Sequence, residues 1–152
     1  MGSEAALLLD AAEFAAWRHR GQRRKDPEGT PYINHPIEDT DTSLAEIEER
    51  FGEEVRRVVE EVTDDKTLPK MERKRLQVER APGSSPRAKL VKLADKLHNL
   101  RDLNRCVPQG WTPQRVQEYF RWAAEVVAGL RGTSPALEAE LQRLFEERGL
   151  GL

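Results

Sequence analysis

A carboxylate and a carboxamide lie four residues apart in the middle of the chain. Asp95 and Asn99 would share one face of a helix, since side chains at that spacing are neighbours on a helix surface. Apolar residues recur around them at helical spacing, which predicts a helix packed against a core. These apolar residues are Leu90, Leu93, Ala94, Leu97 and Leu100. A carboxylate near a core is costly unless it is paired, hydrogen-bonded or bound to a metal. We therefore expect Asp95 to have a compensating partner.

A second set of reactive side chains occupies the segment from Gly21 to Thr42, which shows no helical period. Such a long connection inside a compact domain is usually functional or disordered. It carries a cationic cluster, a histidine beside a proline, and a group of acids: Arg23, Arg24, Lys25, His35, Glu38, Asp39 and Asp41. Each has an ordinary explanation as well. The cations could form a solvated loop, the histidine could be structural, and the acids could favour a helix N-terminus.

The composition bounds the class of protein. A chain of 152 residues, 38% hydrophobic and 34% charged, is typical of one soluble globular domain. A net charge of -2 gives no reason to expect nucleic-acid binding. No apolar run approaches the roughly 18 residues of a membrane helix, and no signal peptide is recognisable. The single cysteine, Cys106, excludes an internal disulfide and a cysteine-based zinc site, which favours an intracellular, cytoplasmic location. Nothing indicates the oligomeric state.

The elements that must position these residues are helices. Ser43 and Glu46 form a capping box before a short helix that ends at Gly52. Further helices are predicted over 4–20, 55–62, 70–80, 113–130 and 135–148, and one carrying Asp95 follows the turn at 82–86. No segment alternates as a strand would. The predicted fold class is all-α, a single-domain helical bundle.

Several motifs, taken in order along the chain, resemble one known family. They are Arg-Lys-x3-Gly-x-Pro-Tyr-x-x-His-Pro at 24–36, Glu-Asp-Thr at 38–40, Val-Thr-Asp-Asp-Lys-Thr at 62–67 and Leu-Ala-Asp-Lys-Leu-His-Asn-Leu at 93–100. Together they resemble the HD-domain hydrolases of the stringent response, in particular the small metazoan single-domain relatives of bacterial SpoT. The resemblance runs from residue 4 to the end of the chain.

That resemblance implies a fold, a cofactor and a reaction. The family is an all-α bundle in which Mn²⁺, bound by a histidine, a His-Asp pair and a later aspartate, activates water. The water cleaves the 3′-pyrophosphate of guanosine tetraphosphate (ppGpp), and metazoan members are also linked to NADPH dephosphorylation. By position, His35 and Asp95 would bind metal and Glu38 and Asp39 would be catalytic. The substrate-binding positions would be Arg24, Lys25, Lys70, Asn99, Arg115 and Tyr119. For Lys70, Arg115 and Tyr119, a surface charge or a core aromatic is an equally good interpretation.

The chain departs from the family at its defining motif. Its histidines are His19, His35 and His98, and none precedes an aspartate. Ile37 runs directly into Glu38, as though about 25 residues, or two ordinary helices, were deleted. A skipped exon or a gene-model error would explain this internal truncation of a domain spanning 1–152. Three hypotheses follow: an impaired metal-dependent pyrophosphohydrolase, a non-catalytic nucleotide-binding module, or a helical interaction module with exposed apolar faces.

Overall fold

The structure, a computed structural model, describes residues 42–151. Within this range every regular element is a helix and none is a strand, which confirms the predicted all-α class. The chain divides into two compact units, residues 1–64 and 65–152. The predicted helix at 4–20 and most of the segment that follows it lie outside the described residues. The prediction of one domain over 1–152 stays a prediction.

The described part of the first unit is a pair of short helices, α3 (Leu44–Phe51) and α4 (Glu53–Val62). As predicted, the Ser43 hydroxyl caps α3 by accepting a hydrogen bond from the Glu46 backbone N–H at 3.1 Å. Gly52 ends α3 at φ +92°, a backbone conformation that glycine adopts without steric cost. The apolar cluster of this unit is small: Ile47 and Phe51 are buried, with Val55 and Val59 packed against them.

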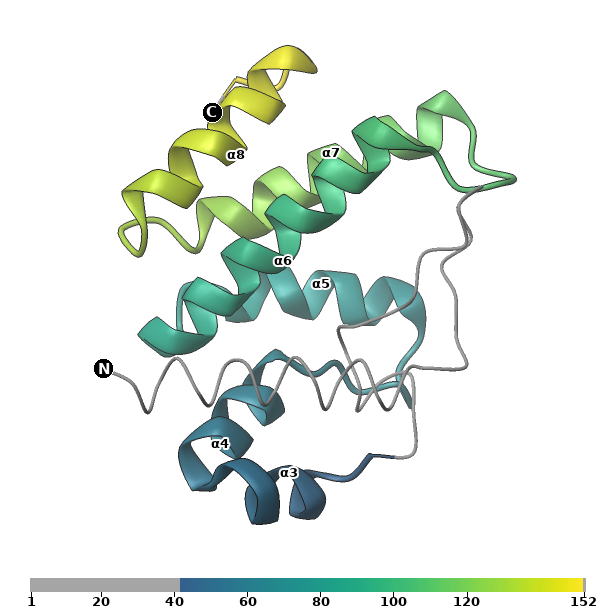
Figure 1. Ribbon diagram of the computed structural model, residues 1–152. Coiled ribbons are helices and arrows are strands. Elements are labelled where there is room, and N and C mark those ends of the chain that lie inside the picture. The colour runs from purple at the N-terminus through teal and green to yellow at the C-terminus, as the bar shows by residue number, and fades with distance from the viewer. Residues whose placement is uncertain (1–41, 152) are drawn as a thin grey trace. The chain divides into compact units, whose positions relative to one another are not determined.

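The second unit contains four longer helices. They are α5 (Lys70–Arg80), α6 (Pro86–Arg105), α7 (Pro113–Ala128) and α8 (Pro135–Glu147). Helix α7 packs against the other three, and α6 also packs against α8 (Figure 1). The sequence predicted these helices to within two residues at the ends for which it gave bounds. α6, α7 and α8 each begin with a proline directly after a capping hydroxyl, a start signal that is local in the sequence.

The core of the second unit is apolar and continuous. Its largest fully buried side chains are Phe120, Phe145, Leu93, Leu100, Leu130, Leu141, Val116 and Val126. The buried face of α6 consists of Leu93, Lys96, Leu97, Leu100 and Leu103, with Ala88 at its start. The prediction that Leu90 and Ala94 are core residues was wrong, since both are exposed. The reason is that α6 turns its Lys96 side toward the core, which rotates Leu90 and Ala94 outward.

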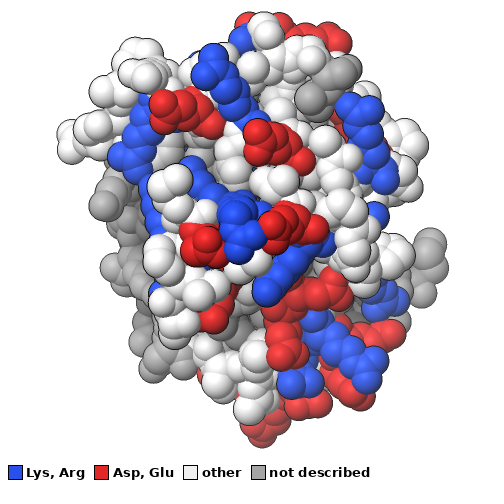
Figure 2. Space-filling model, turned by 180° about the vertical axis from the view of Figure 1, so that it is seen from behind, with Lys and Arg blue, Asp and Glu red and all other residues white. Residues whose placement is uncertain are grey.

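The surface is highly charged, with the two signs interleaved. Figure 2 shows Lys and Arg side chains beside Asp and Glu side chains over the visible face, rather than a surface of one sign. Among the described residues, no helix combines the length and apolar character needed to cross a membrane.

Candidate functional site

Asp95 lies on α6 with its side chain 18% exposed, and its partners are now visible. Its Oδ2 atom is 3.0 Å from the Lys96 ammonium and accepts a hydrogen bond from the Asn99 amide at 3.3 Å. The prediction that Asp95 and Asn99 share a face is therefore confirmed. So is the expectation that a carboxylate next to the core is compensated, although the partners observed here are an ammonium and an amide.

Lys96 was not predicted as a site residue. It is only 4% exposed, and its ammonium also lies 4.7 Å from the centroid of the Trp122 ring on α7. A lysine is rarely buried to this extent unless it is paired. Its burial could have been inferred from helical spacing, because Lys96 lies three residues after the buried Leu93 and four before the buried Leu100.

Tyr119 on α7 joins this group. Burial raises the pKa of its hydroxyl above the usual value, the Lys96 charge lowers it, the Asp95 charge raises it, and a hydrogen bond with Asn99 lowers it. The hydrogen bond with Asn99 places the Tyr119 hydroxyl beside the Asp95–Lys96–Asn99 group. The fold thus brings together three predicted site residues, Asp95, Asn99 and Tyr119.

Three aromatic rings border the group. We call Trp111, Tyr119 and Trp122 the aromatic cluster: ring centroids are 6.0 Å apart for Trp111 and Tyr119, and 5.3 Å apart for Tyr119 and Trp122. The Trp122 indole N–H donates to the backbone carbonyl of Lys74 at 3.0 Å, which ties α7 to α5. Trp111 and Trp122 were not predicted as site residues, since nothing local in the sequence links them.

Cations from three helices surround the aromatic cluster. The Lys74 ammonium lies 4.9 Å from the Trp122 centroid and 5.5 Å from the Tyr119 centroid, and the Arg115 guanidinium lies 4.1 Å from that of Trp111. Burial lowers the pKa of Lys74, and so do the charges of Lys70, Arg115 and Lys96, while Glu118 opposes them. We call Lys70, Lys74, Lys96 and Arg115 the cationic cluster. Its concentration of positive charge suits a phosphate-bearing ligand.

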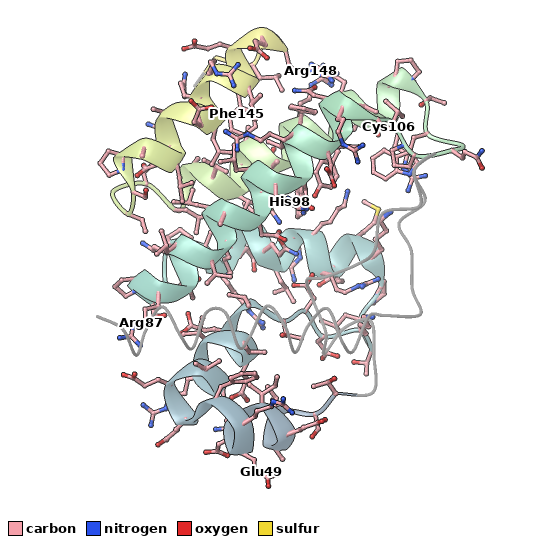
Figure 3. The ribbon with its side chains drawn as sticks, in the orientation of Figure 1. Glu49, Arg87, His98, Cys106, Phe145 and Arg148 are labelled. Atoms are coloured by element: carbon pink, nitrogen blue, oxygen red, sulfur yellow. The ribbon has the colours of Figure 1, made fainter. Side chains whose placement is uncertain are left out.

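The described residues do not by themselves fit a metal ion. Among residues 42–151 no group of three or more His, Cys, Asp or Glu side chains is placed to hold one. His98 lies on α6 (Figure 3), and its side chain is 49% exposed. Its Nε2 atom lies 3.7 Å from Oδ2 of Asp102, so the two form a pair on the surface of the helix. The other expected ligand, His35, lies outside the described residues, as do Glu38, Asp39, Arg24 and Lys25.

Comparison with protein families identifies the class of protein. The model of the HD domain matches residues 37–131, which is more than half of the chain. The all-helical architecture agrees with such a domain. The chain belongs to the HD-domain family, whose hydrolases use a divalent metal.

Individual relatives can then be named. The chain is 64% identical to the mouse protein named guanosine-3′,5′-bis(diphosphate) 3′-pyrophosphohydrolase MESH1, with 100% of both chains covered. It is 48% identical to the Drosophila melanogaster protein of the same name, covering 95% of this chain and 96% of that one. A solved structure described as a metazoan ortholog of SpoT that hydrolyses ppGpp superposes with a TM-score of 0.90 at 47% identity, covering 95% of this chain and 97% of that one.

The mouse protein is longer than this chain. The alignment spans 179 positions, 27 more than the 152 residues of this chain. Positions of the mouse protein therefore exist that have no counterpart here.

Proposed function

We propose that this chain binds a guanosine polyphosphate of the ppGpp type in the second unit, and that it descends from a manganese-dependent 3′-pyrophosphohydrolase whose hydrolytic step is impaired here. The observation that carries the proposal is the convergence of Asp95, Asn99 and Tyr119 with the cationic and aromatic clusters. Lys70, Lys74 and Arg115 offer counter-charges for phosphate groups, and the aromatic rings offer flat surfaces for a base. The names of the mouse and fly relatives support this choice of ligand.

Four of the described residues would contact the nucleotide in this proposal. Lys70 and Arg115 attract and hold phosphate oxygens, and Arg115 is steadied by its contact with Trp111. Asn99 and the Tyr119 hydroxyl provide hydrogen bonds at the nucleotide. Outside the described residues, Arg24 and Lys25 would add further counter-charges, and Glu38 and Asp39 would orient water or move its protons. A metal ion held by His35 and Asp95 would supply Lewis acidity in the family reaction.

The missing His-Asp pair is the reason to propose impairment. None of the three histidines precedes an aspartate, so two of four expected metal ligands are absent from the chain. The 27 positions by which the mouse alignment exceeds this chain support an internal deletion, which we place between Ile37 and Glu38. Hydrolysis of NADPH, the other substrate linked to the family, would be impaired in the same way if it requires the same metal.

Calorimetric titration of the full chain with ppGpp in the presence of a chelator tests the binding proposal. We expect one nucleotide per chain without added metal. Arg115→Met and Tyr119→Leu should each weaken binding about tenfold or more, the effect of losing one charged or stacked contact. Arg121→Met, at another exposed arginine of α7, is the matched control and should bind normally. Absence of binding by the unmodified chain would refute the proposed function.

Release of pyrophosphate from ppGpp tests the impairment. With saturating Mn²⁺ we expect the chain to be slower by orders of magnitude than the mouse relative assayed beside it. Normal metal-dependent turnover would contradict this expectation. Binding without turnover would favour the second hypothesis, a non-catalytic nucleotide-binding module, whereas neither binding nor turnover would leave the helical interaction module. The proposal also places the protein inside the cell, in the cytoplasm. Its expected partner is a small-molecule nucleotide.

A further inference from the structure

The most deeply buried charge of the second unit belongs to Lys96, and neither the family resemblance nor the proposed function assigns it a role. Burying an ammonium is expensive, and this residue is only 4% exposed. Its immediate neighbour along the chain, Asp95, is the residue expected to act in the site. The ammonium and the Asp95 Oδ2 atom are 3.0 Å apart, which is the distance of a charge-assisted hydrogen bond.

The Asp95 carboxylate is oriented from two sides. Lys96 and the Asn99 amide both donate to the same atom, Oδ2, at 3.0 and 3.3 Å. Two donors on one oxygen restrict rotation of the carboxylate group, since turning it would break both contacts at once. Two donors from α6 itself therefore restrain the orientation of Asp95.

Lys96 also connects Asp95 to the neighbouring helices. Its ammonium lies 4.7 Å from the Trp122 centroid, and the Trp122 indole is anchored to the Lys74 carbonyl at 3.0 Å. This contact path runs from α6 through α7 to α5. A displacement of the Lys96 side chain would thus disturb both Asp95 and the Trp122 ring.

We propose that Lys96 is a positioning residue: through its ion pair with Asp95 and its contact with Trp122, it holds Asp95 and Asn99 in place beside the aromatic cluster, so that the site is preorganised in the absence of ligand. The link to ligand binding rests on the proposed function. The ion pair and its geometry do not, which allows the two to be tested separately.

Nucleotide affinity of the full chain is the first measurement. Lys96→Met keeps the length and apolar stem of the side chain but removes the ammonium, and it should weaken ppGpp binding about tenfold through misplacement of Asp95 and Trp122. Lys96→Arg restores a cation and should recover most of that loss. Lys89→Met, a lysine of the same helix six residues before Asp95, is the control and should bind normally. A folded Lys96→Met chain that binds like the unmodified one would overturn the proposal.

A second measurement requires neither ligand nor a stable Lys96 variant. Nitrogen-15 NMR of the lysine ammonium groups should show one signal, from Lys96, that exchanges slowly with water and is displaced by the ring current of Trp122. Asp95→Asn should shift this signal and speed its exchange, and Trp122→Leu should remove the ring-current displacement. A signal unaffected by both substitutions would overturn the proposal.

The two measurements separate the possible failures. If the unmodified chain binds no nucleotide, the proposed function fails, and the NMR result alone decides whether Lys96 orients Asp95. If Lys96→Met does not fold, the NMR comparison of the unmodified, Asp95→Asn and Trp122→Leu chains decides in the same way.

Discussion

At the scale of single residues, the site is a set of polar groups whose charges have been partly removed from water. Lys96 and Asp95 compensate each other, while Lys74 and Tyr119 are shifted away from their charged forms by burial. Side chains with shifted pKa values are common in sites that bind ionic ligands. Their behaviour can be measured without knowing the ligand.

Tyr119 provides a prediction about pH. Burial raises the pKa of its hydroxyl above the value of 10.0 expected for an unfolded chain, so the folded state resists ionisation. The unfolded state would then lose its proton first, and stability should fall as the pH rises above 10 toward the folded pKa. Titration of phenolate absorbance should show one of the two tyrosines ionising late.

Tyr119→Phe is the control for this titration. It should remove the late phase and leave the signal of Tyr32 unchanged. Ionisation of both tyrosines near pH 10 in the folded chain would contradict the prediction.

At the scale of elements, close approaches and caps decide how the helices meet. Gly129 ends α7 against the end of α5: a Cβ atom there would lie 2.9 Å from the Ala81 Cβ and 3.0 Å from the Pro82 Cδ. Since the φ of Gly129 is -81°, the requirement for glycine comes from this contact and not from backbone strain.

Gly129→Ala should therefore destabilise the chain by about 1–3 kcal/mol, the range for overpacking a close contact. Gly83→Ala is the matched control, because its added Cβ would meet only the Arg80 carbonyl at 3.9 Å. That change should alter stability by less than about 1 kcal/mol. Chemical denaturation of the two variants measures the difference, and equal effects would contradict the role of the contact.

The start of α8 depends on one carboxylate. Glu138 accepts hydrogen bonds from the backbone N–H groups of Gly132, Thr133 and Ser134 at 3.0–3.2 Å. These three residues precede the first turn of α8, and the carboxylate ties them to the helix. Glu138→Ala should cost about 0.5–2 kcal/mol, the range for losing a side chain that caps a helix start, measured by thermal or chemical denaturation. Glu125→Ala, at an exposed position of α7, should have little effect, and similar losses for the two variants would argue against the cap.

At the scale of the whole molecule, the two units differ in the size of their cores. In the described part of the first unit only Ile47 and Phe51 are buried in the apolar cluster, and α4 has no buried residue. The second unit has a continuous core that spans α5 to α8. Local opening requires less free energy where fewer apolar contacts are lost.

Hydrogen exchange should reflect this difference. Peptides from α4 are expected to exchange faster than peptides from the centres of α6 and α7. Mass spectrometry of the intact chain after brief labelling would measure it. Equal protection of α4 and α7 would show that the first unit is as stable as the second.

Metal removal is the last prediction. Because Lys96 and Asn99 already compensate Asp95, the second unit should not need a metal ion to fold. Adding a chelator should leave the thermal midpoint of the purified chain unchanged, and adding Mn²⁺ should raise it little. A large fall in the midpoint on chelation would contradict this expectation and would indicate a metal that the described residues do not reveal.

The sequence alone determined the features that depend on near neighbours along the chain. Helix starts at Ser43, Ser85, Thr112 and Ser134 use a side chain that caps a backbone group three residues away, and Asp95 meets Asn99 one helical turn later. Spacing is sufficient for such contacts. Helical periodicity and the family resemblance also predicted the all-α class.

Only the tertiary structure decided which charges are buried and which helices supply the walls of the site. The rotation of α6 placed Lys96 inside and Leu90 outside, and the packing of α7 on α5 and α6 brought Trp122 to Lys74 and Lys96. The physical reason is that these contacts join residues far apart in sequence. Helical periodicity shows that a face is apolar, but only packing against a partner fixes where that face begins and ends.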